Sequence, residues 1–292
     1  MTAATPSRIG RTIAIVRPPG DSFVRAVSTH PERDRIDPER ARAQHAAYCR
    51  LLEAAGVEVV ELAPDEAHPD ACFTQDPAIV LEGRALLGRF GASSRRGEEK
   101  AIADVLGSLV QFVDAVQPPG ALEGGDVLRV GRRIVVGRSR RTNDAGIEAL
   151  RRFAEPVGWE VCTAEVPSWA LHLQTAATGV GDRIVLGPQE VVTQPAFAGL
   201  DRVVVPDDDR GAGNVAVIDR TNQGKRPFVI AAGSHPVHGE LEARGFEVHA
   251  TALDEFERAD GSPTCLSLLV EPIVASYPGG TPASVPPPRD TV

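Results

Sequence analysis

The sequence predicts an α/β fold in which five like-built units close into a ring. A strand-like run recurs roughly every 45 residues, a period typical of closed or stacked arrays. Each run is followed by a polar loop with Gly or Pro, and then by two further apolar runs. In several copies a tight Gly turn joins these two runs, as in a β-hairpin. A helical stretch leads to the next copy, so the repeated unit is strand, loop, hairpin and helix.

The strands of the ring are expected in order along the chain. The strand-like runs lie at 58–63, 111–116, 160–165, 201–206 and 247–252. The hairpins turn at Gly83, Gly131 and Gly181, and the fourth, longer one passes through 222–224. The two chain ends share the remaining unit: residues 12–16 supply one strand, and the stretch after Cys265 supplies its hairpin partner.

The helices follow from capping signals. Asp37 can cap a helix, Pro38 suits its first position, and Gly56 can end it. Similar helical stretches are expected to start near Gly97, Asn143, Gln189 and Pro236.

Composition narrows the class of function. The chain has 292 residues, of which 42% are hydrophobic and 24% charged, enough for a large core. Its net charge of -9 disfavours a nucleic-acid or membrane partner and is compatible with a small cationic substrate. The sequence has no membrane-spanning run and no signal-peptide layout, so we expect a cytoplasmic protein. Residues 9–276 are predicted to form one domain, and 1–8 and 277–292 disordered tails.

The loop before each hairpin holds the candidate functional residues. If the units are equivalent, these loops occupy corresponding positions around the ring axis. They carry, in chain order, residues 70–76, 123–126, His172, Asn214 and 260–265. A thiol, an imidazole and several carboxylates would then meet at one site, a set suited to covalent catalysis. The four cysteines lie far apart without a CxxC pair, so no zinc knuckle or disulfide framework is indicated.

Each candidate also has a purely structural interpretation. By residue type alone, Cys265 is more typical of a small buried hydrophobic side chain. His172 alternates with apolar neighbours, as a strand histidine with satisfied partners would. The acids of 123–126 and of 70–76 could be turn residues or solvated loop charges. The repeat register favours the catalytic interpretation, because His172 alone among seven histidines falls at a ring position.

Seven ordered motifs resemble those of the dimethylarginine dimethylaminohydrolase family. They are DACFTQD (70–76), SRR (94–96), LEGGDVL (122–128), RTN (141–143), LHL (171–173), VPDD (205–208) and DGSPTC (260–265). The resemblance runs from about the first strand to Pro272. The family has the five-bladed αβ-propeller called the pentein fold, which agrees with the ring of repeats.

The resemblance implies hydrolysis of Nω-methylated arginines to citrulline and dimethylamine or methylamine. It implies Cys265 as the nucleophile, which forms a covalent thiouronium intermediate. His172 would act as general acid and then as general base. Glu123 would orient His172 or hold the substrate guanidinium.

The same resemblance implies a set of substrate-binding residues. Asp76 would pair with the guanidinium and Asp70 with the α-amino group. Arg95 and Arg141 would bind the α-carboxylate, a task that suits the planar guanidinium fork. Gln75 stands where many family members have a second acid, so either guanidinium affinity or methylation preference is expected to differ. No metal or organic cofactor is implied.

Three other functions are weighed against this one. An arginine deiminase would release ammonia from unmethylated arginine, but its helical insertion has no obvious room here. An amidinotransferase would transfer the amidino group to an amine instead of water, and the sequence leaves this function open. It also leaves open whether the protein forms a homodimer. A non-catalytic binding protein of this fold would have no reason to keep Cys265, His172 and Glu123 together.

Overall fold

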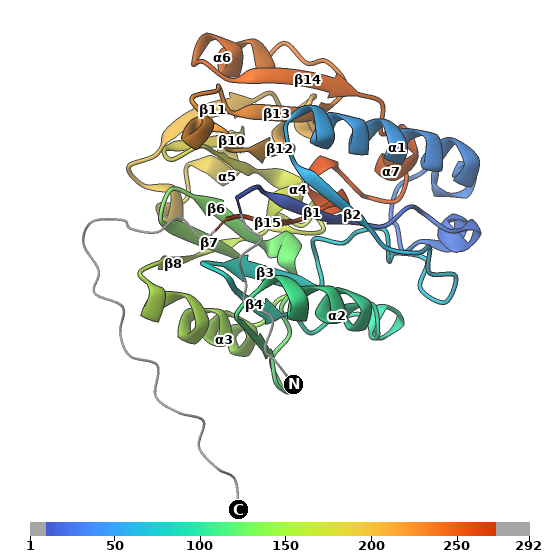
Figure 1. Ribbon diagram of the computed structural model, residues 1–292. Coiled ribbons are helices and arrows are strands. Elements are labelled where there is room, and N and C mark those ends of the chain that lie inside the picture. Colours follow the sequence, from blue (N-terminus) through green and yellow to red (C-terminus); the bar gives the residue numbers. More distant parts are fainter. Residues whose placement is uncertain (1–9, 273–292) are drawn as a thin grey trace, which may run out of the picture.

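The computed structural model describes residues 10–272, and the predicted tails at 1–8 and 277–292 lie outside this part of the chain. The described residues form five three-stranded sheets arranged as a five-bladed αβ-propeller, as the repeats predict (Figure 1). Within them, no helix combines the length and the apolar character needed to cross a membrane.

Every sheet consists of an antiparallel pair of strands and a third strand that is parallel to its neighbour in that pair. In one sheet β3 (Ala78–Leu81) pairs with β4 (Arg84–Leu87), and β4 pairs with β5 (Phe112–Ala115). The helix α2 (Glu99–Leu109) joins β4 to β5, because parallel neighbours need a long crossover.

Three further sheets repeat this order. The first consists of β6 (Val127–Val130), β7 (Arg133–Arg138) and β8 (Glu160–Glu165), with helix α3 (Asp144–Ala154) before β8. The second consists of β9 (Thr178–Val180), β10 (Ile184–Pro188) and β11 (Asp201–Val205), with α5 (Gln189–Val192) before β11. The third consists of β12 (Val215–Ile218), β13 (Phe228–Ala232) and β14 (Glu247–Thr251), with α6 (His238–Ala243) before β14. The single-turn helices α4 (Leu173–Ala176) and α7 (Asp254–Glu257) lie in loops between sheets.

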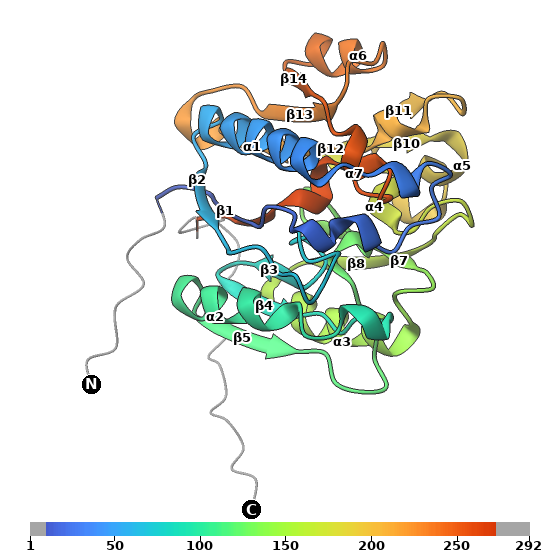
Figure 2. The same ribbon diagram turned by 90° about the vertical axis from the view of Figure 1, so that its right-hand side faces the viewer.

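The fifth sheet joins the two ends of the chain, as predicted. β1 (Ile13–Val16) pairs antiparallel with β15 (Leu268–Val270) and parallel with β2 (Glu58–Glu61). The helix α1 (Pro38–Ala54) connects β1 to β2. Figures 1 and 2 show β1 and β2 together under α1, although α1 separates them in sequence. The ring is therefore closed by hydrogen bonds between distant segments.

Local sequence signals account for most element boundaries. The Asp37 carboxylate accepts hydrogen bonds from the first turn of α1, and Gly56 after the helix has φ +87°. The Asn143 side chain caps α3 in the same way. The helix expected near Gln189 is only one turn, since Pro195 holds Gln194 in extended backbone soon afterwards.

The strands that form one sheet do not coincide with the repeated unit predicted from the sequence. The predicted unit starts on a strand, whereas each outer strand pairs with the hairpin that precedes it. The loop after each outer strand must therefore cross from one sheet to the next. These crossing loops are the segments that carry the candidate functional residues.

The apolar core is divided among five clusters in the described chain, each between neighbouring sheets. Strand β1 shows how. Ile13 and Ile15 pack in the cluster that includes α2, and Ala14 and Val16 pack in the cluster that includes α1. Alternate residues of a strand face opposite sides, so a strand buried on both faces joins two clusters. Full burial of a side chain such as Ile15 contributes roughly 1.5–3 kcal/mol.

A glycine at one seam between sheets should be required for stability. A Cβ on Gly179 of β9 would overlap the carbonyl oxygen of Arg129 in β6. We expect Gly179→Ala to lower the free energy of unfolding by about 1–3 kcal/mol, measured by urea denaturation. Gly107 in α2 is the matched control, because a Cβ there meets nothing within 4 Å. Gly107→Ala should stabilise by up to about 1 kcal/mol. Equal stability of the two variants would contradict this packing.

Candidate active site

Three crossing loops line one small pocket with candidate functional residues, and Glu123, from a fourth crossing loop, contacts the His172 ring beside it. Cys265, His172, Asp70 and Asp76 line the pocket together with Arg95 and Arg141. The remaining lining residues are apolar or lie near Cys265: Val27, Phe73, Leu171, Ala259, Asp260 and Gly261. The cavity volume is about 10 Å³, room for about one water molecule. The pocket is therefore closed over, and a larger ligand requires movement of its walls.

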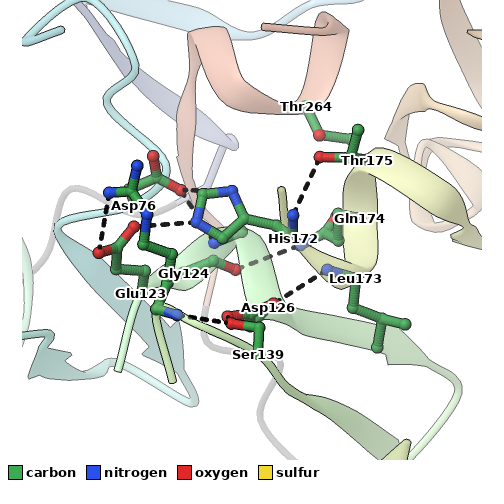
Figure 3. Close-up of polar contacts among 12 residues, drawn as sticks. Asp76, Glu123, Gly124, Asp126, Ser139, His172, Leu173, Gln174, Thr175 and Thr264 are labelled. Carbon is green, nitrogen blue, oxygen red and sulfur yellow. Dashed lines mark hydrogen bonds and ion pairs between the residues drawn. The ribbon is translucent and has the colours of Figure 1, made fainter. Parts of the chain in front are cut away.

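His172 is held between two acids. It lies just before α4, where Leu173 N–H donates to Asp126 Oδ1 at 2.9 Å. Its Nε2 lies 2.9 Å from Glu123 Oε2, and its Nδ1 lies 4.0 Å from Asp76 Oδ1 (Figure 3). Burial alone would lower the pKa of His172, but Asp76 and then Glu123 and Asp126 raise it to about 9. The imidazole is therefore protonated at neutral pH.

Glu123 is fully buried and fixes the imidazole from one side. Its Oε1 accepts from Gly91 N–H at 3.1 Å and contacts Arg141 NH1 at 3.5 Å. The following glycines let the chain approach closely: a Cβ on Gly125 would lie 2.7 Å from Asp76 Oδ1 and 2.8 Å from the His172 ring. Gly125 N–H itself donates to Asp76 Oδ1 at 3.0 Å.

Cys265 lies in the short turn Pro263–Leu266 and is 7% exposed. The buried Asn214 holds this turn, because its Oδ1 accepts from Thr264 N–H at 3.1 Å and its Nδ2 donates to Thr264 Oγ1 at 2.8 Å. Burial, and next the charge of Asp76, raises the pKa of the Cys265 thiol to about 12. The thiol is therefore protonated unless a positive charge lies close to the sulfur.

Arg95 is clamped among acids. Its NH1 donates to Asp76 Oδ2 at 2.6 Å, and its Nε and NH2 donate to Glu98 at 2.7–3.2 Å. Arg141, 8% exposed, contacts Glu123. The Asp70 carboxylate accepts from Val27 N–H at 3.1 Å, which ties the segment around Val27 to the pocket.

Gln75 does not line the small pocket, although its backbone N–H donates to the Cys265 carbonyl at 3.3 Å. Its side chain lines a larger cavity of about 520 Å³ with Gly124 and Gln174, and not the pocket that contains Cys265. Its Oε1 is buried without a hydrogen-bond partner among the described residues. Asp76, the next residue, lines the small pocket. The structure thus separates two neighbours that the sequence analysis grouped together.

Buried carboxyl groups outnumber the positively charged groups around the pocket. Five buried carboxyl groups of the described chain surround it: Asp70, Asp76, Glu98, Glu123 and Asp126. The positive groups beside them are Arg95, Arg141 and the His172 imidazolium. Burial raises the pKa of Asp70 and of Asp126, and it raises that of Glu98 to about 7. Such a cluster favours an added cation, since unpaired buried charges are costly.

A metal ion would have to compete for these groups. Asp76, Glu123 and His172 offer ligand atoms within 4.8 Å of one another. Arg95 already donates to Asp76, and the His172 ring contacts Glu123. Two carboxylates at this spacing suit a guanidinium, which can donate to more than one carboxylate at once.

Sequence reasoning assigned no role to three residues that shape the pocket. Asp126 and Asn214 were placed in the crossing loops without a function, and here they hold His172 and Cys265 in position. Glu98, which pairs with Arg95, was not singled out. The charged pair at 95 and 98 was the available signal, since residues three apart can meet on one turn.

Comparisons with known proteins agree with this arrangement. Residues 19–229 match the family described as N,N dimethylarginine dimethylhydrolase, eukaryotic. The chain is 36% identical to the N(G),N(G)-dimethylarginine dimethylaminohydrolase of Streptomyces coelicolor, over 87% of this chain and 95% of that protein. It is 30% identical to the enzyme of the same name from Pseudomonas aeruginosa, over 87% and 97%.

A solved structure has the same fold. A cysteine-to-serine variant of the Pseudomonas aeruginosa enzyme, complexed with citrulline, superimposes with a TM-score of 0.80 at 26% identity. The match covers 90% of this chain and 99% of that one. The chain therefore belongs to the dimethylarginine dimethylaminohydrolase family.

Proposed function

We propose that the protein hydrolyses Nω-methylated arginines, asymmetric dimethylarginine and monomethylarginine, to citrulline and dimethylamine or methylamine. The match to this chain covers 95% and 97% of two relatives that are named for that activity. Solved relatives hold citrulline in one case and an adduct with S-methyl-L-thiocitrulline in another. Both molecules are amino acids with a side chain of the size and shape of arginine.

One observation carries the proposal: Cys265 and His172 line a buried pocket around which carboxyl groups outnumber the groups that carry positive charge. A guanidinium supplies that charge and places an electrophilic carbon beside the sulfur. Asp76 would take the guanidinium, and Asp70 the α-ammonium group. Arg95 and Arg141 would take the α-carboxylate as a planar, two-pronged contact.

Binding of the substrate is coupled to opening of the pocket. The cavity of about 10 Å³ cannot hold an amino acid. The Asp70 carboxylate holds Val27 N–H, and an incoming ammonium group would compete for the same oxygens. Arg95 NH1 likewise holds Asp76 Oδ2 until a substrate guanidinium arrives. Substrate therefore replaces internal partners of both acids.

The first half of the reaction forms a covalent intermediate. The substrate cation lowers the pKa of the Cys265 thiol, which releases its proton to solvent and becomes a thiolate. The sulfur attacks the central guanidinium carbon. The bond from that carbon to the methylated nitrogen breaks, and the His172 imidazolium gives its proton to the departing amine.

The second half returns the enzyme to its starting state. Neutral His172 takes a proton from a water molecule, which attacks the carbon of the thiouronium intermediate. The carbon–sulfur bond breaks, the added hydroxyl group loses its proton, and citrulline leaves. The thiolate then takes up a proton, which restores the thiol. Glu123 holds the imidazole in place through both halves, because its carboxylate contacts Nε2. The cytoplasmic location and the lack of a nucleic-acid or membrane partner remain predictions from the sequence.

A substrate panel tests the reaction directly. We expect citrulline and the matching amine from asymmetric dimethylarginine and from monomethylarginine, measured by mass spectrometry. Plain arginine should be turned over far more slowly. Turnover of arginine with release of ammonia, and none of the methylated forms, would identify a deiminase instead.

Replacement of the proposed nucleophile should abolish turnover. We expect Cys265→Ser to lower kcat by at least about 1000-fold, since a hydroxyl is far harder to ionise than a thiol. Cys162→Ser is the matched control, because Cys162 is half-buried in β8 and contacts Glu160. That control should retain full activity. An active Cys265→Ser variant would exclude this cysteine as the nucleophile.

Glu123 should contribute to the raised pKa of His172, together with Asp76. Glu123 stabilises the protonated form of His172, so Glu123→Gln should lower the His172 pKa from about 9 by roughly 1–3 units. The measurement is an NMR titration of the imidazole in the ligand-free protein. Glu160→Gln, an exposed acid of β8, should leave that titration unchanged. An unaltered His172 pKa in Glu123→Gln would contradict the proposed contact.

A further inference from the structure

Glu98 is a buried carboxyl group beside the pocket that has no part in the chemistry described above. It lies one residue before α2 and is 2% exposed. Its two oxygens accept Arg95 Nε at 3.0 and 3.2 Å, and its Oε2 accepts Arg95 NH2 at 2.7 Å. This two-pronged contact fixes the plane and the rotation of the guanidinium.

The remaining edge of Arg95 is thereby directed at the pocket. With Nε and NH2 held by Glu98, NH1 is left to donate to Asp76 Oδ2 at 2.6 Å. The flat face of the guanidinium lies 4.5 Å from the centre of the Phe90 ring, which limits tilting. The Arg95 guanidinium is therefore held by Glu98 at one edge, by Asp76 at the other edge and by the Phe90 ring on its face.

The backbone is built to bring Glu98 back to Arg95. Gly97, between them, has φ +112°, a conformation that favours glycine, and the Glu98 N–H donates to the Arg95 carbonyl at 3.3 Å. A Cβ on Gly97 would lie 3.0 Å from His68 Nε2. The turn returns the carboxylate to the arginine three residues before it, and α2 then leads away.

We propose that Glu98 is a positioning residue that holds Arg95 in the orientation from which it pairs with the α-carboxylate of the substrate. The inference rests on the proposed function, in which Arg95 binds that carboxylate. Without Glu98, the Arg95 guanidinium can rotate about its side chain and loses its preset direction. Affinity for amino-acid substrates then falls, while the reacting groups Cys265 and His172 are untouched.

The test compares Glu98→Gln with Glu99→Gln on two substrates. Glu99 is the adjacent acid, and its carboxylate accepts from Gly97 N–H without a contact to Arg95 among its hydrogen bonds here. The substrates are monomethylarginine and its decarboxylated counterpart, methylated agmatine. If methylated agmatine turns over too slowly for its KM to be measured, its inhibition constant against turnover of monomethylarginine is measured instead.

Glu98→Gln is expected to raise KM for monomethylarginine by about tenfold or more, with kcat within about threefold of the parent. The constant for the decarboxylated compound should stay within about threefold. Glu99→Gln should match the parent in every measurement. An equal rise for both compounds, a fall in kcat alone, or no change would each overturn the proposal.

Glu98→Asp separates positioning from simple stability. It keeps the charge on a shorter side chain, so it should recover part of the lost affinity, with thermal unfolding measured for all variants. If Glu98→Gln does not fold, Glu98→Asp must still raise KM for monomethylarginine alone, or the proposal fails. A parent enzyme that turns over no methylarginine would instead refute the proposed function itself.

Discussion

The structure depends on a buried imbalance of charge at the centre of the ring. Five carboxyl groups in the described chain face two guanidinium groups and one imidazolium. This imbalance keeps His172 protonated and, through Asp76, helps to keep Cys265 a thiol. The same carboxyl groups that help to keep Cys265 a thiol favour a bound cation, because a guanidinium stabilises both the acids and a thiolate. The positive charge of the substrate thus favours the thiolate form of Cys265 that the reaction requires.

The ring explains how such a site can be buried at all. The two ends of each crossing loop lie in two neighbouring sheets, and these sheets share an apolar cluster. The packing between sheets therefore offsets the cost of concentrating charge on the axis. Buried hydrogen bonds complete the support: Asp126 holds the backbone beside His172, and Asn214 holds the backbone beside Cys265.

Much of the fold could be predicted because its signals are local. The cap at Asp37 and the strand repeat are visible in a few residues, and the equivalence of the loops placed Cys265 and His172 at one axis. Side-chain direction is not local, so Gln75 was grouped with Asp76 although it lines another cavity. His172, predicted only to lie in the loop before a hairpin, is found at the start of a one-turn helix whose backbone is held by a distant acid. Glu98 was missed although its spacing from Arg95 is visible in the sequence, because the turn at Gly97 that returns its carboxylate to Arg95 is defined only in the folded chain.

The most direct measurement of the charge imbalance is calorimetric binding to the Cys265→Ser variant, which removes turnover. Asymmetric dimethylarginine and citrulline share the same α-amino and α-carboxylate groups, but only the first has a positive side chain. If the buried acids require a cation, dimethylarginine should bind at least about tenfold more tightly than citrulline, with the gap narrowing as the pH falls and the acids are neutralised. Equal affinity for the charged and the neutral ligand would contradict the account.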